Sequence, residues 1–118
     1  MQKFVALYTG SSSDAERAKW NQMDEQSRKK REDAGMKAWR DWGVKHATSI
    51  VDQGSPLGRT KRVGRDGISD IRNSIAAYVI VQAESHEAAA KMFEGHPHFA
   101  IFPGDSVEIM PCNEIPRR

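Results

Sequence analysis

The sequence predicts a single α+β domain, residues 1–118, in the order β-α-β-β-α-β with an extra hairpin. Three observations lead to this fold class. Segments 3–9 and 74–84 consist of β-forming residues that are apolar at both odd and even positions. Two stretches of helix-forming residues lie between predicted strands. The length of 118 residues is that of one domain, which buries about two thirds of its surface without needing disulfides.

The first predicted strand spans residues 3–9 and carries apolar side chains on both faces. One face holds Phe4, Ala6 and Tyr8, and the other holds Val5 and Leu7. A strand that is apolar on both faces is typical of the centre of a sheet. We therefore expect this strand to have neighbours on both sides.

Two helices are predicted after this strand. The first spans residues 14–33, with Ser13 or Asp14 as candidate N-caps. Its charged segment 24–33 carries both signs, so we interpret it as a solvated face, although a role as a partner surface stays open. Gly35 is expected to break or kink the chain. A second helix then covers 36–49, with Met36, Trp39, Trp42 or Gly43, and His46 at spacings of three and four.

Segments 50–73 predict short β elements and turns. The apolar pair Ile50-Val51 is followed by a turn over 54–58, which is rich in Gly, Ser and Pro. Segments 60–63 and 68–71 flank Asp66-Gly67, a dipeptide typical of β-hairpins. The hairpin is polar, so we expect it at an edge or over an opening.

The last third of the chain predicts strand, helix and strand. The strand covers 74–84, and Ser85 is the expected N-cap of a helix over 85–94. Gly95 should end that helix, and Pro97 should bar its continuation. A final strand spans 106–110, and the tail 113–118 is polar.

Without the hairpin, the order of elements is the ferredoxin-like pattern, in which two helices cover one face of an antiparallel sheet. The central strands here are apolar on both faces, so the second face needs a cover. A second copy of the chain can supply it, which predicts a homodimer, or a higher assembly, in the form of a dimeric α/β barrel.

Several blocks of the sequence resemble the YCII-related family. They cover most of the chain outside 11–35, and they are 3–10 (KFVALYTG), 50–58 (IVDQGSPLG), 77–89, Gly95-His96-Pro97-His98, Gly104 and 107–111 (VEIMP). The resemblance implies a dimeric α/β barrel and an activity that is largely undefined. Some members are regarded as candidate enzymes because a His in the first long helix lies near an Asp in a cleft. The matching stretch 36–39 contains no His, and the nearest is His46.

Composition excludes several classes of protein. No apolar run approaches the roughly 20 residues that span a bilayer, so we expect no membrane contact. Eighteen basic against sixteen acidic side chains give no basic field for nucleic acid. The single Cys112 cannot form an internal disulfide, which favours a reducing cytoplasm as the location. Leu, Ile, Val and Phe make up only 21 of 118 residues, a thin core that pairing with another chain would complete.

Two groups of side chains are candidates for a site. His96 and His98 lie two residues apart around Pro97, where they could act on a ligand; alternatively, His96 caps helix carbonyls and His98 packs near the next strand. His46 shares a helix face with Trp39 and Trp42, either as a general base in a cleft or as a packed histidine.

Tyr78, in the middle of a strand, could orient a substrate or pack on the sheet. Asp52 and Asp66 are explained by turns, and Cys112 by an incidental position.

The functional hypothesis is a small-molecule site for a polar or aromatic metabolite, with or without catalysis. His46 and His98 are the predicted catalytic residues. The predicted ligand-binding residues are Trp39, Trp42, Tyr78 and His96. The alternative is a ligand-sensing or assembly module that uses the same barrel without chemistry. The motifs indicate no cofactor and no bound metal.

Overall fold

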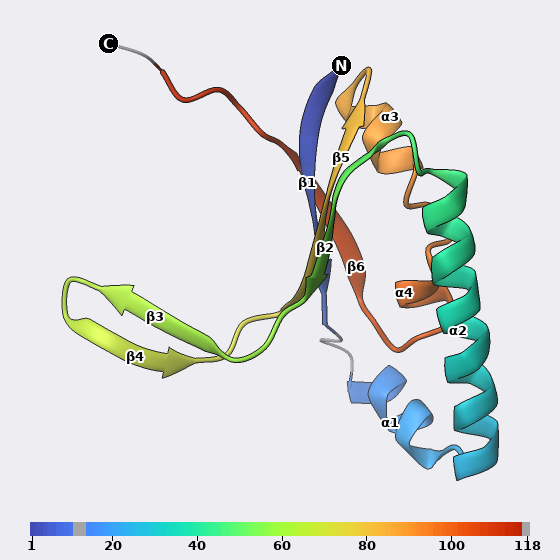
Figure 1. Cartoon of the computed structure of the whole chain (residues 1–118). Coiled ribbons are helices and arrows are strands. Elements are labelled where there is room, and N and C mark those ends of the chain that lie inside the picture. Colours follow the sequence, from blue (N-terminus) through green and yellow to red (C-terminus); the bar gives the residue numbers. More distant parts are fainter. Residues whose placement is uncertain (11–13, 117–118) are drawn as a thin grey trace.

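Four strands of the chain form one antiparallel sheet with helices on one face (Figure 1). The computed structural model describes residues 1–10 and 14–116. The elements are β1 (Gln2–Thr9), α1 (Asp14–Gln22), α2 (Glu25–Lys45), β2 (Ile50–Pro56), β3 (Thr60–Gly64), β4 (Gly67–Ile71), β5 (Ile75–Ala83), α3 (His86–Lys91), α4 (Pro97–Ala100) and β6 (Ser106–Pro111).

The strand order in this sheet is β2-β5-β1-β6, so both predicted central strands, β1 and β5, lie inside it. Phe4 of β1 faces Val81 of β5 on one side and Pro111 of β6 on the other. The mixed α+β class and the strands predicted over 3–9, 74–84 and 106–110 are therefore confirmed, with shifts of a residue at some ends.

The core lies between the sheet and the helices. Its buried members are Phe4, Ala6, Tyr8, Val79, Val81, Ala83, Ala89 and Phe93. The opposite face of the sheet, which we call the open face, carries the alternate residues of the same strands, and these are half-buried or exposed. Its apolar residues are Val5, Leu7, Tyr78, Ile80 and Met110. The predicted apolar character of both faces is therefore present, and the open face has no cover within the described part of the chain.

Gly35 does not break a helix, contrary to the sequence-based expectation. Helix α2 continues through it, and the segment after α4 approaches the helix closely at this point. A Cβ at Gly35 would lie 2.5 Å from Cε2 of the Phe102 ring. The break falls instead before Asp24, which caps α2 by accepting a 2.7 Å bond from the Ser27 amide. This hydrogen bond and the one from the Ser27 hydroxyl hold the Asp24 pKa below its usual value.

The ends of the other helices and strands lie closer to the predicted positions. Ser85 caps α3 as predicted, but the helix ends at Lys91, and Pro97 opens the short helix α4 rather than only barring the previous one. The predicted turn over 54–58 is wrong in its first half, because β2 runs to Pro56 with irregular pairing around Gly54. Ser13 lies outside the described residues, and Asp14 is the first residue of α1.

The predicted hairpin forms as β3 and β4, with Gly64 paired to Gly67 across the turn. It is not an edge of the main sheet. It is a separate two-stranded sheet that projects away from the body on the side opposite α2 (Figure 1). We call residues 59–72 the arm.

Candidate functional site

A buried group of three hydrogen-bonding rings lies between α2 and the sheet. Tyr8 comes from β1, His96 is the N-cap of α4, and His98 belongs to α4. Tyr8 and His96 are 2% and 0% exposed, and His98 is 9% exposed. Polar rings this deep need hydrogen-bond partners, and each of the three has one.

The partners fix the tautomer of His96. Its Nδ1 accepts a hydrogen bond from the His98 backbone N–H at 3.0 Å, so Nδ1 carries no proton. In the neutral ring the proton is then on Nε2, which lies 3.3 Å from the Tyr8 hydroxyl and donates to its oxygen. The His96 side chain therefore caps the first turn of α4 by accepting an N–H. The interpretation that His96 caps carbonyls of the preceding helix is met only by its backbone N–H, which donates to the Phe93 carbonyl at 3.1 Å.

His98 is held against the end of β1. Its Nε2 donates to the Thr9 carbonyl at 2.6 Å, so Nδ1 is the acceptor atom of the neutral ring. Gly104 packs against this imidazole so closely that an added Cβ would collide with Cε1 and Nε2. The ring thus has little freedom to turn.

Aromatic side chains surround the imidazoles. The Trp39 ring meets His96 edge-on at 4.5 Å between centroids, and Trp42 does so at 4.8 Å. Trp42 is itself fixed, because its Nε1 donates to the Met92 carbonyl at 2.8 Å. The Phe93 ring also lies beside His96, with 5.9 Å between the ring centroids. We call Tyr8, His96, His98, Trp39, Trp42 and Phe93 the aromatic–histidine cluster.

Burial sets the charge state of this cluster. It lowers the pKa of His96 to about 4, and the nearby His98 and His46 add to that effect. Burial also raises the pKa of the Tyr8 hydroxyl. At neutral pH both groups are therefore uncharged, so the pair can offer hydrogen bonds, but His96 is not an imidazolium and lacks the second proton that a general acid would donate.

The cluster unites four of the six residues predicted for a site: Trp39, Trp42, His96 and His98. His46 lies at its margin, as the C-cap of α2, with its ring 5.0 Å from that of Trp42. Partial burial, and then Lys45, lower the pKa of His46. Tyr78 is not part of the cluster, because it lies on the open face of the sheet, paired with Leu7.

The sequence analysis did not single out Tyr8, although a signal for it was present. Tyr8 alternates with Phe4 and Ala6 on one face of β1, and a tyrosine on a fully apolar face needs a partner for its hydroxyl.

The turn assignment of Asp52 is supported, because its carboxylate accepts from the Gly54 amide at 2.8 Å. Asp66, near the hairpin turn, pairs with Arg62 at 3.3 Å.

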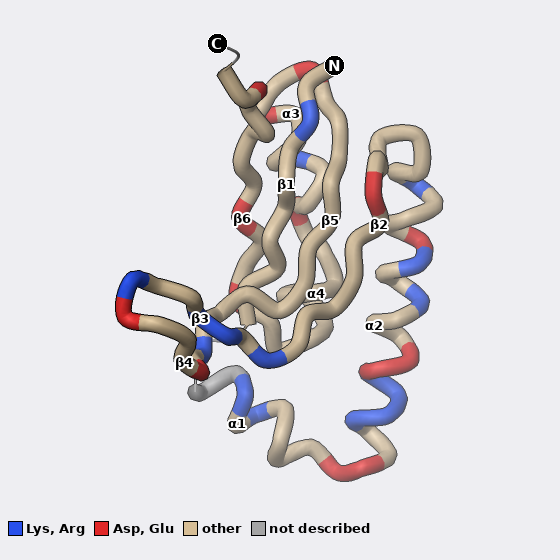
Figure 2. Tube along the Cα trace, turned by 60° about the vertical axis from the view of Figure 1, so that its left-hand side comes forward, with Lys and Arg blue, Asp and Glu red and all other residues tan. Residues whose placement is uncertain are grey.

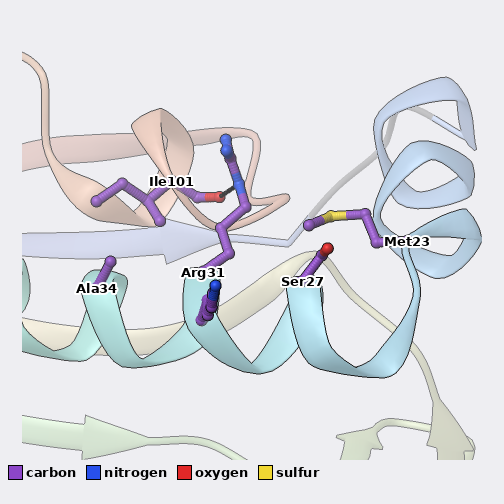
Figure 3. Close-up of a pocket in the computed structure, with 6 residues that line it drawn as sticks. Met23, Ser27, Arg31, Ala34 and Ile101 are labelled. Atoms are coloured by element: carbon purple, nitrogen blue, oxygen red, sulfur yellow. Dashed lines mark hydrogen bonds between the residues drawn. The ribbon is translucent and has the colours of Figure 1, made fainter.

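Two surface hollows lie away from the cluster. A shallow groove of about 410 Å³ runs between the first half of α2 and the segment after α4, where Arg31 Nε donates to the Ile101 carbonyl at 3.0 Å (Figure 3). Its lining residues are Met23, Ser27, Lys30, Arg31, Ala34 and Ile101. A second hollow, of about 940 Å³, lies at the base of the arm. Neither contains a residue of the cluster.

The described residues also show what the chain has for metals and membranes. They contain no group of three or more His, Cys, Asp or Glu side chains placed to hold a metal ion. None of their helices is long and apolar enough to cross a membrane.

Comparison with known proteins identifies a likeness in fold. No family model and no curated protein matches the sequence. Among solved structures, the chain is similar to 5-chloro-2-hydroxyhydroquinone dehydrochlorinase from Burkholderia phenoliruptrix AC1100, in complex with 2,5-dihydroxybenzoquinone, with a TM-score of 0.54 and 12% identity. The match covers 94% of this chain and 93% of that one. At this identity the likeness is one of fold. The chain is thus a mixed α+β protein with a structural neighbour of the dimeric α/β barrel type.

Proposed function

We propose that this chain is a YCII-related, ferredoxin-like subunit of a dimeric α/β barrel that binds a small polar or aromatic molecule at the aromatic–histidine cluster. Support for the architecture comes from the antiparallel strand order β2-β5-β1-β6 and from the uncovered, half-apolar open face. The dehydrochlorinase, which shares the fold, holds a dihydroxybenzoquinone, an oxygen-bearing aromatic ring.

The observation that carries the binding site is the hydroxyl of Tyr8. Its oxygen accepts from His96, and its own proton has no acceptor among the described residues. A hydroxyl donor without an acceptor, surrounded by aromatic rings, can donate a hydrogen bond to an oxygen atom of a ligand. Trp39 and Trp42 supply flat apolar surface for a ring, and His96 holds the tyrosine in place from behind.

We propose that a ligand enters the cluster from the side of the segment after α4. Phe102 covers Trp39 there, with 6.2 Å between ring centroids, and Trp20 of α1 packs on Phe102 at 5.8 Å. A ligand reaches the Tyr8 hydroxyl when this two-ring cover moves aside. We therefore expect ligand binding to be accompanied by displacement of α1.

The first experiment is calorimetric titration of the purified protein with two probes, 2,5-dihydroxybenzoquinone and hydroquinone. Tyr8→Phe should weaken binding about tenfold, the effect of one lost hydrogen bond of about 1.4 kcal/mol. Tyr78→Phe is the matched control, because it removes the same group from the other face of the sheet and should leave the affinity unchanged. Absence of binding to the wild-type protein, or equal affinities for Tyr8→Phe and wild type, would contradict the proposal.

A non-enzymatic ligand-sensing or assembly module is the second candidate function. It is favoured by the uncharged state of His96 and Tyr8, since neither carries a readily exchanged proton at neutral pH. Native mass spectrometry gives the mass of the assembly and of any retained molecule. It therefore shows whether a probe added to the protein stays bound unchanged or is converted. Conversion of a bound probe to product would then exclude the purely non-enzymatic function.

A further inference from the structure

The arm makes few contacts with the rest of its own chain. An isolated two-stranded hairpin is marginally stable in water. Its two strands pair only with each other. Val63 and Ile68, a directly opposed pair near the turn, are 76% and 72% exposed. Two exposed branched apolar side chains on a projecting hairpin indicate a surface that is covered by a partner.

The arm also carries an excess of positive charge. Its basic side chains outnumber its acidic ones by five to two (Figure 2). The two acidic residues are already paired, Asp70 with Lys61 at 2.7 Å and Asp66 with Arg62 at 3.3 Å. The remaining three have no ion pair within the described part of the chain: Arg59, Arg65 and Arg72. A surface that fits the arm should therefore offer carboxylates as well as apolar groups.

The position of the arm restricts which surface it can meet. Both views place it on the side of the sheet opposite α2, the side of the open face (Figures 1 and 2). Strands of five residues extend about 16 Å, whereas two sheets that pack face to face are about 10 Å apart. A sheet stacked on the open face therefore lies within the reach of the arm.

We propose that the arm grips a second copy of this chain when the two open faces pack together. This inference rests on the dimeric barrel of the proposed function. It adds to that barrel a contact between the arm of one copy and the body of the other, which we call the arm clasp. Val63 and Ile68 pack against the flank of the partner copy, and the free arginines of the arm meet its acidic groups. Glu108 is a suitable acceptor, because it is exposed on the open face, opposite Leu7, and has no ion pair within the described residues.

Shortening the arm tests this proposal. Thr60 and Ile71 are paired at its base, so residues 61–70 can be replaced by an Asn-Gly turn without separating the flanking segments. Sedimentation equilibrium should show a dimer for the wild-type chain. For the shortened chain we expect a dimer dissociation constant at least tenfold higher, with an unchanged circular dichroism spectrum in the helical region.

A second, milder variant keeps the test valid if the shortened chain misfolds. Val63→Thr combined with Ile68→Thr keeps β-forming residues in the arm but removes its apolar contact. It should also weaken the dimer by at least threefold. Val44→Thr is the control, because Val44 is equally exposed but lies on α2, and it should not change the dissociation constant.

The outcomes separate the two proposals. A wild-type monomer at all concentrations overturns both the barrel dimer and the arm clasp. A wild-type dimer whose dissociation constant is the same in the shortened chain and in the threonine variant overturns the clasp and leaves the barrel dimer standing. Weakening by both arm variants, with Val44→Thr unaffected, supports the clasp.

Discussion

Tyr8 and His96 lie 88 residues apart in the chain, and their hydroxyl and Nε2 atoms meet at 3.3 Å in the interior. The bond joins the central strand β1 to the N-cap of α4. Because Nδ1 of the same imidazole accepts the His98 amide, a proton added to His96 would face an N–H donor rather than an acceptor. This geometry and the burial of the ring act in the same direction, against the charged form.

The low pKa of His96 predicts a loss of stability in mild acid. The unfolded chain takes up a proton near pH 6.5, whereas the folded chain does so only near pH 4. Stability from this group is therefore complete above pH 6.5 and falls as the pH drops towards 4, by about 1.4 kcal/mol per pH unit. Urea unfolding between pH 4.5 and 8 measures the slope. His96→Gln should flatten it, and a slope equal to that of the wild-type protein would refute this assignment.

The close approach of Phe102 to α2 predicts opposite effects for two glycines of one helix. Gly35→Ala should destabilise the fold by about 1–3 kcal/mol, because the new methyl group collides with the Phe102 ring. Gly43→Ala should stabilise it by about 0.5–1 kcal/mol, since nothing lies within 4 Å of its Cβ position and alanine favours the helix. Thermal unfolding of both variants is the measurement. A stabilising Gly35→Ala would show that the segment after α4 does not pack there.

The indole of Trp42 is expected to matter more for stability than that of Trp39. Both rings contact His96, but only Trp42 donates a side-chain hydrogen bond within the described residues, to the Met92 carbonyl. Trp42→Phe should therefore cost about 1 kcal/mol more than Trp39→Phe in free energy of unfolding. Denaturant titration of the two variants compares them directly. Equal losses would mean that ring volume alone accounts for the effect.

The cap of α3 gives a test of a feature predicted from the sequence. Ser85 accepts the Ala88 amide at 3.0 Å, so Ser85→Ala should cost about 1 kcal/mol of stability. Ser85→Asp keeps a cap acceptor and should restore the wild-type value within a few tenths of a kcal/mol. If both substitutions destabilise the protein equally, the cap is not the source of the effect.

The sequence was informative where the physical cause was local. The alternation of Phe4, Ala6 and Tyr8 identified a central strand, and the side chain of Ser85 identified a helix start. Asp66-Gly67 placed the hairpin within a residue. These features depend on residues only a few positions apart in the chain, so the local sequence pattern is enough to predict them.

The features that the sequence did not predict depend on distant partners. A glycine such as Gly35 is typical of a helix break. Only the close approach of Phe102 explains why a glycine is needed here inside a continuous helix. Four of the six predicted site residues meet because α2 and α4 cover the same face of the sheet. Tyr78 is on the other face, since its place in the alternation of β5 is opposite to that of Val79 and Val81. The roles of these six residues in binding or catalysis remain predictions.

The sheet order has a consequence for how the protein is made. Strand β1 is synthesised before the other strands of the sheet, yet both of its neighbours come much later in the sequence: Phe4 pairs with Val81 and with Pro111. The central strand therefore has no partner until β5 has been synthesised, and it gains its second partner only with β6. Nascent chains that end before β6 would expose one edge of β1, and we expect such fragments to bind chaperones or to aggregate, whereas chains that include β6 do not.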